Sequence, residues 1–212
     1  MNPKDAYYET CAASIRKHLE KRRMEGYYCK SSQEARDLAL SFVKEGDVVS
    51  FGGSMTLAET GLLEELRRKE RITLLDRSTA STPEEVQQIY EKAFTADAYF
   101  MSTNAITLSG ELVNIDGNGN RAAALIWGPK QVIILAGMNK VCPTLEDAVR
   151  RARELAAPPN CIRLNKQTPC AYSGSCGDCY GDDCICSQTV ITRRSQIPGR
   201  IKVILTRETL GY

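Results

Sequence analysis

The chain has 212 residues, of which 42% are hydrophobic and 25% are charged. This length suits one domain with a substantial core, and this composition is typical of a globular protein rather than a disordered or fibrous one. The 28 Lys and Arg residues nearly balance the 26 Asp and Glu residues, which argues against a protein that binds nucleic acid by neutralising its phosphates. No stretch approaches the ~20 apolar residues that span a bilayer, and the N-terminal segment lacks the apolar run of a signal peptide. We therefore expect a cytoplasmic protein.

Two residue counts narrow the chemistry. The only histidine, His18, lies in a highly charged stretch, IRKHLEKRR, so a histidine-based mechanism must use it or be dropped. A solvated helix face is the expected environment for such a stretch. The nine cysteines are an odd number, and five of them fall between Cys170 and Cys186. In a chain without an export signal, such cysteines indicate thiol or metal chemistry rather than a disulfide framework.

Two helices are predicted in residues 1–45, packed on the same domain as the rest of the chain. The first has apolar side chains every three or four residues and ends near Gly26. The second begins at Ser31, with Glu34 three residues later as in a capping box, and ends at Gly46.

The remainder, residues 46–212, alternates short apolar runs with amphipathic stretches. The predicted strands are 47–51, 72–76, 98–102, 131–136 and 200–206, and the predicted helices are 56–69, 82–96 and 145–156. Pro158 and Pro159 are expected to close the last helix, and residues 105–116 are expected to form an inserted hairpin. This order predicts an α/β fold with a mostly parallel sheet flanked by helices.

In such sheets, ligands bind beyond the carboxyl ends of the strands. Three turns containing glycine or asparagine leave predicted strand ends, at 52–54, 102–104 and 137–140. The first, Gly52-Gly53-Ser54, lies between a strand and a helix, where free backbone N–H groups form a cradle for a phosphate or carboxylate. A plain tight turn with Ser54 as the helix cap is the alternative. The lysine that a P-loop requires is missing.

The segment NIDGNGNR, residues 114–121, is the second candidate region. Arg121 follows its tight turn and is expected either to hold a carboxylate or phosphate or to pair with Asp116. A plain loop is the simplest account of Gly117 to Asn120, and the acidic pattern of a calcium loop is absent.

Two further side chains are candidates for proton transfer or charge neutralisation. Lys140 follows the most strand-like run of the chain and could contact a charged ligand, act as a base if desolvated, or remain a solvated loop residue. Glu59 is the carboxylate best placed near the glycine turn, although most helix glutamates only solvate a face.

The segment 169–187 is the most unusual part of the sequence. A C-x-x-C pair, Cys176 and Cys179, could chelate one metal ion, with Cys170 and Cys186 completing four thiolates and Cys184 as a substitute. Zinc or an iron–sulfur cluster would both suit these ligands. Free thiols and a redox-labile disulfide remain alternatives.

Four stretches of the sequence together resemble a known family. They read GGSMTLAETGLLEEL, NAITLSGELVNIDGNGNRAAALIWGP, GMNKVCPTLEDAVRRARELAAPPNCIRL and PCAYSGSCGDC. From about Val48 onward, the chain resembles the lactate-utilisation (LUD) domain family of bacteria, in the short single-domain form with a cysteine segment. The family pattern has an arginine near Cys184.

The resemblance implies a fold similar to the ribose-5-phosphate isomerase, glucosamine-6-phosphate deaminase and CoA-transferase group. It also implies a role in oxidising L-lactate to pyruvate beside iron–sulfur oxidoreductase subunits. It supplies no established catalytic residues. Overlap between its motifs and the strand-end argument adds Asn104 to the candidates for ligand binding, which are Gly52, Gly53, Ser54, Asn104, Asn120, Arg121 and Lys140.

Two functions are therefore carried forward. In the first, the chain is a subunit or accessory factor of lactate oxidation that holds a metal or cluster. In the second, it is a stand-alone enzyme or binding protein for a small phosphorylated or CoA-linked acid, in which Glu59 or Asp116 moves a proton.

Overall fold

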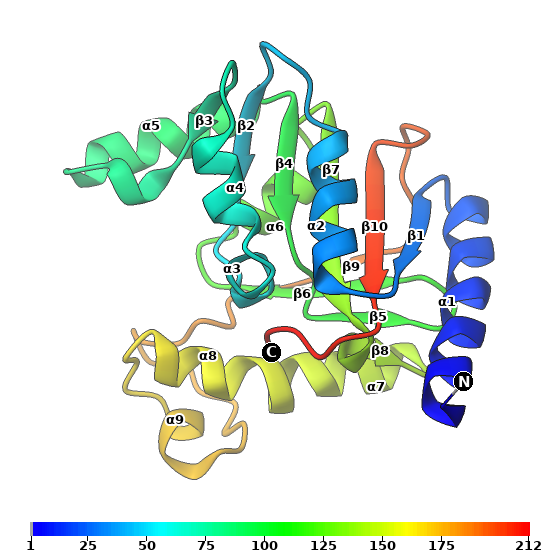
Figure 1. The fold of residues 1–212 in the computed structure, drawn as a ribbon. Helices are drawn as coiled ribbons and strands as arrows, with labels where there is room; N and C mark the ends of the chain where they lie inside the picture. The colour runs from blue at the N-terminus through cyan, green and yellow to red at the C-terminus, as the bar shows by residue number, and fades with distance from the viewer. Residues whose placement is uncertain (1) are drawn as a thin grey trace.

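The computed structural model describes residues 2–212 and has an α/β architecture built around two sheets (Figure 1). The main sheet has six strands, all parallel, in the order β1-β10-β7-β4-β2-β3. Its strands are β1 (Glu25–Cys29), β2 (Val48–Phe51), β3 (Thr73–Leu75), β4 (Ala98–Met101), β7 (Gln131–Gly137) and β10 (Ile201–Thr206). The predicted fold class, a parallel sheet flanked by helices, is confirmed.

A smaller sheet contains the expected hairpin. Strands β5 (Ala105–Thr107) and β6 (Leu112–Asp116) pair antiparallel. The strands β8 (Val141–Cys142) and β9 (Gln188–Thr192) extend the hairpin on its two sides. The second half of the chain therefore contributes to both sheets.

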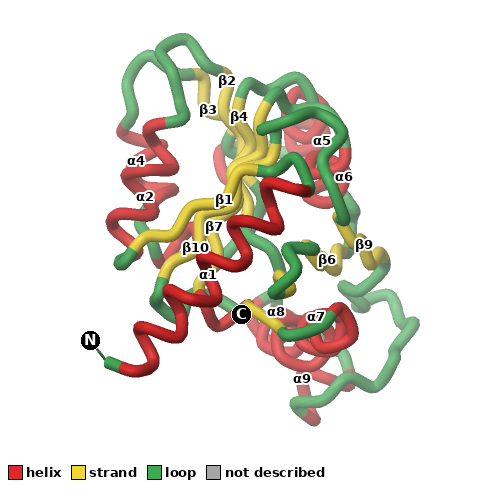
Figure 2. Tube along the Cα trace, turned by 90° about the vertical axis from the view of Figure 1, so that its right-hand side faces the viewer, coloured by secondary structure: helices red, strands yellow, loops and turns green. Residues whose placement is uncertain are grey.

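Helices cover both faces of the main sheet (Figure 2). Those on one face are α2 (Ser32–Ser41), α3 (Met55–Glu59) and α4 (Leu62–Arg68); those on the other are α1 (Pro3–Lys21), α5 (Pro83–Ala93) and α6 (Asn120–Ile126). Below the smaller sheet lie α7 (Leu145–Arg151), α8 (Ala157–Arg163) and the short α9 (Pro169–Ser173). Two 3₁₀ turns, Arg77–Thr79 and Met138–Lys140, follow β3 and β7.

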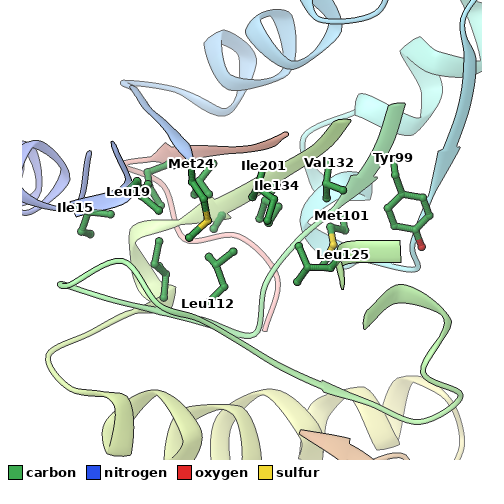
Figure 3. Close-up of a cluster of buried hydrophobic side chains, with 14 of the residues drawn as sticks. Ile15, Leu19, Met24, Tyr99, Met101, Leu112, Leu125, Val132, Ile134 and Ile201 are labelled. Atoms are coloured by element: carbon green, nitrogen blue, oxygen red, sulfur yellow. The ribbon is translucent and has the colours of Figure 1, made fainter. Parts of the chain in front are cut away.

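The alternation of side chains along β7 shows how the core is divided. Val132 and Ile134 lie in the cluster between the main sheet, α1 and the hairpin (Figure 3). Ile133 and Leu135 point to the opposite cluster, beneath α2, α3 and α4. Because successive strand residues face opposite sides, a strand covered on both faces must be apolar throughout, as this one is.

Strand β1 lies between the two helices predicted in residues 1–45, where the sequence pattern predicts no strand. The segment EGYYC is mostly half-buried. It shows neither the apolar–polar alternation of a half-buried strand nor the continuous apolar run of a fully buried one. It becomes a strand because β10 offers a parallel edge, with Glu25 opposite Lys202 and Cys29 opposite Thr206. The N-terminal residues are therefore part of the main sheet.

The expected end of the 145–156 helix is wrong. The chain instead continues from α7 through a π-helical run, Ala152–Ala156, into α8. Pro158 and Pro159 lie in the first turn of α8, where a missing N–H is tolerated. The helix expected at 56–69 is also divided, because Gly61 adopts a left-handed conformation between α3 and α4.

Candidate functional site

A cleft with a volume of about 410 Å³ lies at the carboxyl ends of β2, β3, β4 and β7. The chain runs outward from β2 to β3 and then returns to the other side of β2 to form β4. Such a reversal of strand order leaves a crevice between the loops that follow the two strands. Here those loops are Gly52–Ser54 and Ser102–Asn104, both of which contribute to the lining of the cleft.

The glycine turn after β2 supports a guanidinium group in the cleft. A Cβ atom on Gly53 would lie 2.5 Å from one Nη atom of Arg77, so a larger residue would push the guanidinium group away from the turn. The other Nη atom of Arg77 donates to the hydroxyl of Tyr90 (2.9 Å). No carboxylate within residues 2–212 forms a salt bridge with Arg77. Ser54 caps α3 by accepting from Leu57 N, as expected of the plain turn.

Arg121 is held by groups of the protein itself. One Nη atom donates to the carbonyl of Ser102 (3.1 Å) and to Asn114 Oδ1 (2.6 Å). The other donates to Asn104 Oδ1 (3.2 Å) and to the carbonyl of Ile115 (2.7 Å). Burial lowers the pKa of Arg121, and the nearby Asp116 carboxylate opposes that effect. These contacts agree with the structural alternative for Arg121, which fastens the β4 loop to the end of β6.

Asp116 is likewise occupied. Its carboxylate accepts from the backbone N–H groups of Gly119 (3.0 Å) and Ala122 (3.1 Å), at the start of α6, and lies 3.5 Å from Arg121 Nε. Both carboxylate oxygens are therefore engaged by backbone donors at the start of the helix. The arrangement positions the loop more readily than it transfers a proton.

Lys140 has the most unusual environment in the cleft. Its side chain lies among neutral partners: Nζ donates to Thr56 Oγ1 (2.9 Å) and to Ser102 Oγ (3.1 Å), and the residue is only 3% exposed. Burial, together with the positive charges of Arg151 and Arg121, lowers the pKa of Lys140 to about 7. A substantial fraction of this amine is therefore neutral at neutral pH.

The segment after β10 passes beside this lysine. Asn139 Oδ1 accepts from Leu210 N (3.2 Å), and Glu59 Oε2 accepts from Gly211 N (2.7 Å). Tyr212 contributes to the cleft lining, whereas Glu59 does not. Glu59 therefore lies beside the cleft and fastens this segment.

The structure brings most of the predicted residues together. Six of the seven ligand-binding candidates and Asp116 line the cleft, namely Gly53, Ser54, Asn104, Asp116, Asn120, Arg121 and Lys140. Gly52 does not line the cleft, and a Cβ there would be 3.1 Å from the side chain of Arg121. His18 lies elsewhere, on α1, with Nδ1 3.0 Å from the carbonyl of Ser14.

Other lining residues were missed by the sequence analysis. Arg77 follows β3, so the strand-end argument applied there would have found it. Nothing in the local sequence of Asn160, Arg163 and Lys166 points to the cleft, because they reach it only through the unexpected helix α8 and the loop after it.

A second cavity, of about 500 Å³, lies next to the cleft and shares Ile115 and Ile185 with it. Six cysteines line it: Cys161, Cys170, Cys176, Cys179, Cys184 and Cys186. Cys161 comes from α8 and had no place in the predicted ligand set, yet its sulfur lies 3.6 Å from that of Cys170. Arg153, from the π-helical run, donates to Cys176 Sγ (3.4 Å) and to Asp178.

The thiols are soft donors that suit zinc or an iron–sulfur cluster, but they are not gathered around one point. Among residues 2–212, no group of three or more His, Cys, Asp or Glu side chains is arranged to hold a metal ion. Burial raises the pKa of Cys161 to about 11 and that of Cys186 to about 12. Both thiols are therefore protonated at neutral pH, and a metal would have to displace those protons.

The LUD domain matches residues 12–206. The chain belongs to the LUD domain family. A DUF162 family protein from Deinococcus radiodurans resembles this LUD domain with a TM-score of 0.51 at 10% identity, over 94% of this chain and 98% of that chain. This likeness concerns the fold alone.

The beta subunit of eIF2B from Chaetomium thermophilum matches with a TM-score of 0.37 and 18% identity, over 55% of this chain and 44% of that one, too low to support an argument. The search of curated proteins gave no match. Within residues 2–212 of this LUD domain, no helix is long and apolar enough to cross a membrane.

Proposed function

We propose that this LUD domain acts in lactate utilisation, as a subunit or accessory factor in the oxidation of L-lactate to pyruvate, and that its cleft binds the small acid anion. Membership of the LUD domain family supports the lactate-related role. The observation that carries the ligand class is the convergence of Arg77 and Lys140 on one polar cleft beyond the strand ends. Arg77 is the cation expected to meet the carboxylate, since Arg121 is held by protein groups.

In this proposal, other proteins accept the electrons that lactate loses. A small acid bound in the cleft would lie next to the thiol cavity, because both are lined by Ile115 and Ile185. Iron–sulfur oxidoreductase subunits are the proposed partners, and the compartment is proposed to be the bacterial cytoplasm.

Calorimetric titration tests the ligand class. We expect L-lactate or pyruvate to bind to the full chain and Arg77→Ala to weaken that binding at least tenfold, without a change in melting temperature. Arg68→Ala is the matched control, because Arg68 is an exposed arginine paired with Glu65 on α4. Equal binding by the wild type and Arg77→Ala would contradict the proposed role of Arg77.

A stand-alone enzyme or binding protein for a phosphorylated or CoA-linked acid is the alternative. Asn160, Arg163 and Lys166 favour it, because they add polar and basic groups to the outer wall of the cleft. Sugar phosphates and acyl-CoA thioesters belong in the same titration. Tight binding of one of them, with none of lactate or pyruvate, would replace the first proposal by this one.

The thiol cavity supports a second candidate property, the binding of zinc or an iron–sulfur cluster. Six cysteines around one cavity form a soft donor set, although the sulfur atoms would have to move inward to form a coordination shell. Cys170, Cys176, Cys179 and Cys186 remain the proposed ligands, with Cys184 as a substitute, and Cys161 joins them as a candidate.

Metal analysis and an absorption spectrum of anaerobically prepared protein test this property. We expect one site per chain, reduced by Cys161→Ser or Cys179→Ser but not by Cys11→Ser, since Cys11 is buried on α1 away from the cavity. Colourless, metal-free protein with full activity beside its partners would overturn it.

A further inference from the structure

Lys140 is a buried amine in the cleft, and the proposed binding of an acid anion uses its position there but not the nucleophilicity of its nitrogen. The strand β7 delivers it to the carboxyl edge of the sheet, where the 3₁₀ turn Met138–Lys140 directs it inward. Arg151 holds this turn in place by donating from Nε to the carbonyl of Asn139 (3.0 Å). The amine is therefore positioned by the main sheet and by α7 together.

The partners of the amine are all neutral oxygens. Thr56 Oγ1 and Ser102 Oγ accept its hydrogen bonds, and no carboxylate in residues 2–212 lies within salt-bridge distance of Nζ. Glu59, the acid whose charge acts on Lys140, is engaged with the backbone N–H of Gly211. A lysine that only balanced charge would be expected beside a carboxylate, whereas Lys140 is held by two hydroxyl groups, which orient its amine without forming an ion pair.

Buried lysines with a lowered pKa serve as nucleophiles because their lone pair is free at neutral pH. The lowered pKa of Lys140 follows from burial and from the neighbouring arginines, as described above. Neighbouring cations lower the pKa of a lysine and so activate its amine, while the amine still lines the cleft where a ligand can contact it.

We propose that Lys140 Nζ attacks the carbonyl carbon of a 2-oxo acid bound in the cleft and forms a covalent imine. The nitrogen lone pair forms the C–N bond while the carbonyl oxygen takes up a proton and the nitrogen loses one, giving a carbinolamine. Loss of water then gives the C=N bond, and addition of water reverses the sequence. No oxidant or reductant is consumed, and Arg77 supplies the positive charge that holds the carboxylate of the acid.

This inference rests on the proposed acid-binding function and makes it more specific. It selects a 2-oxo acid over a 2-hydroxy acid, because only the former carries an electrophilic carbonyl carbon. L-lactate, the 2-hydroxy acid, would bind in the cleft without a covalent bond. Pyruvate, the 2-oxo acid, would stay bound to Lys140 as the imine until water hydrolyses the C=N bond.

Borohydride trapping tests the imine directly. The full chain is incubated with pyruvate as the probe, reduced with sodium borohydride, digested and mapped by mass spectrometry. We expect one reduced adduct, located on Lys140, and none when L-lactate replaces pyruvate. Lys140→Arg should abolish the adduct, whereas Lys92→Arg, at an exposed position on α5, should leave it unchanged.

The pH dependence adds a readout that a surface lysine would not give. Trapping at Lys140 should be half-maximal near pH 7, whereas exposed lysines require a pH near 10. An adduct spread over several exposed lysines, or one that survives in Lys140→Arg, would overturn the imine. Because peptide mapping of the wild type locates the adduct by itself, the test does not depend on the folding of the variant.

Failure of the imine is distinguishable from failure of the proposed function. Calorimetric binding of pyruvate without any trapped adduct would refute the covalent step and leave the acid-binding cleft standing. Absence of binding by every acid in the titration would refute the acid-binding cleft itself.

Discussion

At the scale of single residues, Lys140 ties the stability of the protein to pH. Its ordinary pKa near 10.5 applies to the unfolded chain, whereas the folded protein lowers it to about 7. Between these two values the unfolded chain binds a proton that the folded state resists. Stability from this group is therefore greatest above pH 10, falls as the pH drops towards 7, and is constant below that.

Lys140→Met removes this dependence. We expect the melting temperature of the variant minus that of the wild type to rise as the pH falls from 10 to 7, since each unit of pKa difference corresponds to about 1.4 kcal/mol. Thermal melts of both proteins at matched pH values measure this difference, and other ionisable groups cancel in it. A difference that does not vary with pH would contradict the environment described for Lys140.

For Arg121 we expect a large effect on stability, because its side chain links the β4 loop to β6 at the cleft. Arg121→Ala would remove the guanidinium donors of the acceptors at Ser102, Asn114 and Ile115, and would leave Asn104 Oδ1 with only the backbone N–H of Ile115. We expect a loss of about 3 kcal/mol in the free energy of unfolding, measured in urea. Arg77→Ala should change it by less than about 0.5 kcal/mol, and a reversed ranking of the two variants would contradict the roles assigned to these arginines.

At the scale of elements, Gly137, the last residue of β7, allows the segment after β10 to approach closely. A Cβ on Gly137 would meet Asn139 Oδ1 and the carbonyl of Glu208, and would lie 2.9 Å from Leu210 N. Gly137→Ala should therefore displace this segment from the cleft and raise the pKa of Lys140 by admitting water. Amide hydrogen exchange at Leu210 and Gly211 is expected to accelerate, whereas Gly181→Ala, with open space around it and no left-handed backbone, should not alter that exchange.

The elements also show what the sequence could predict. The capped helices were predicted because a cap is a local interaction: Ser31 accepts from Glu34 N, and Thr82 accepts from Glu85 N. The edge strand β1 was not, since its conformation depends on pairing with β10, about 175 residues away along the chain. Helix α8 was missed because two prolines usually end a helix, and here they fall in a first turn.

The same distinction applies to the candidate site. Turns that follow strands could be assigned to one edge of a parallel sheet, which is why Gly53, Asn104 and Lys140 were found to line one cleft. The sequence could not indicate that Arg121 would be saturated by protein acceptors, because its partners come from β4, β6 and the loops around them. Contacts between distant elements decide whether an arginine is available to a ligand.

At the scale of the whole molecule, the sheet joins the N-terminal residues to the rest of the fold. Ile15 and Leu19 of α1 are fully buried in the cluster beneath β10 and β7. Burial of each such side chain contributes about 2 kcal/mol to the free energy of unfolding. Strand β1 also forms backbone hydrogen bonds with β10, which would otherwise be an exposed edge strand. Together these contributions are comparable to the net stability of a typical domain.

A fragment of residues 46–212 should therefore fail to fold alone. We expect no cooperative thermal transition by circular dichroism and self-association in gel filtration, because the edge of β10 is exposed. Addition of a peptide of residues 1–45 should restore the transition in part. A fragment that melts like the full chain would show that the N-terminal residues are dispensable for folding.

The π-helical run Ala152–Ala156 sets the direction in which the side chains of α8 point relative to those of α7. Its wider turn adds one residue relative to a regular α-helix, and one residue corresponds to about 100° of rotation. Side chains before and within the run contact the turn of Lys140 and the thiol segment, whereas Asn160 and Cys161 beyond it line the cleft and the thiol cavity. A homologue lacking that single extra residue would keep every side chain that reaches the two cavities yet orient α8 away from them, so the spacing of this helix is as informative about shared function as the identity of its residues.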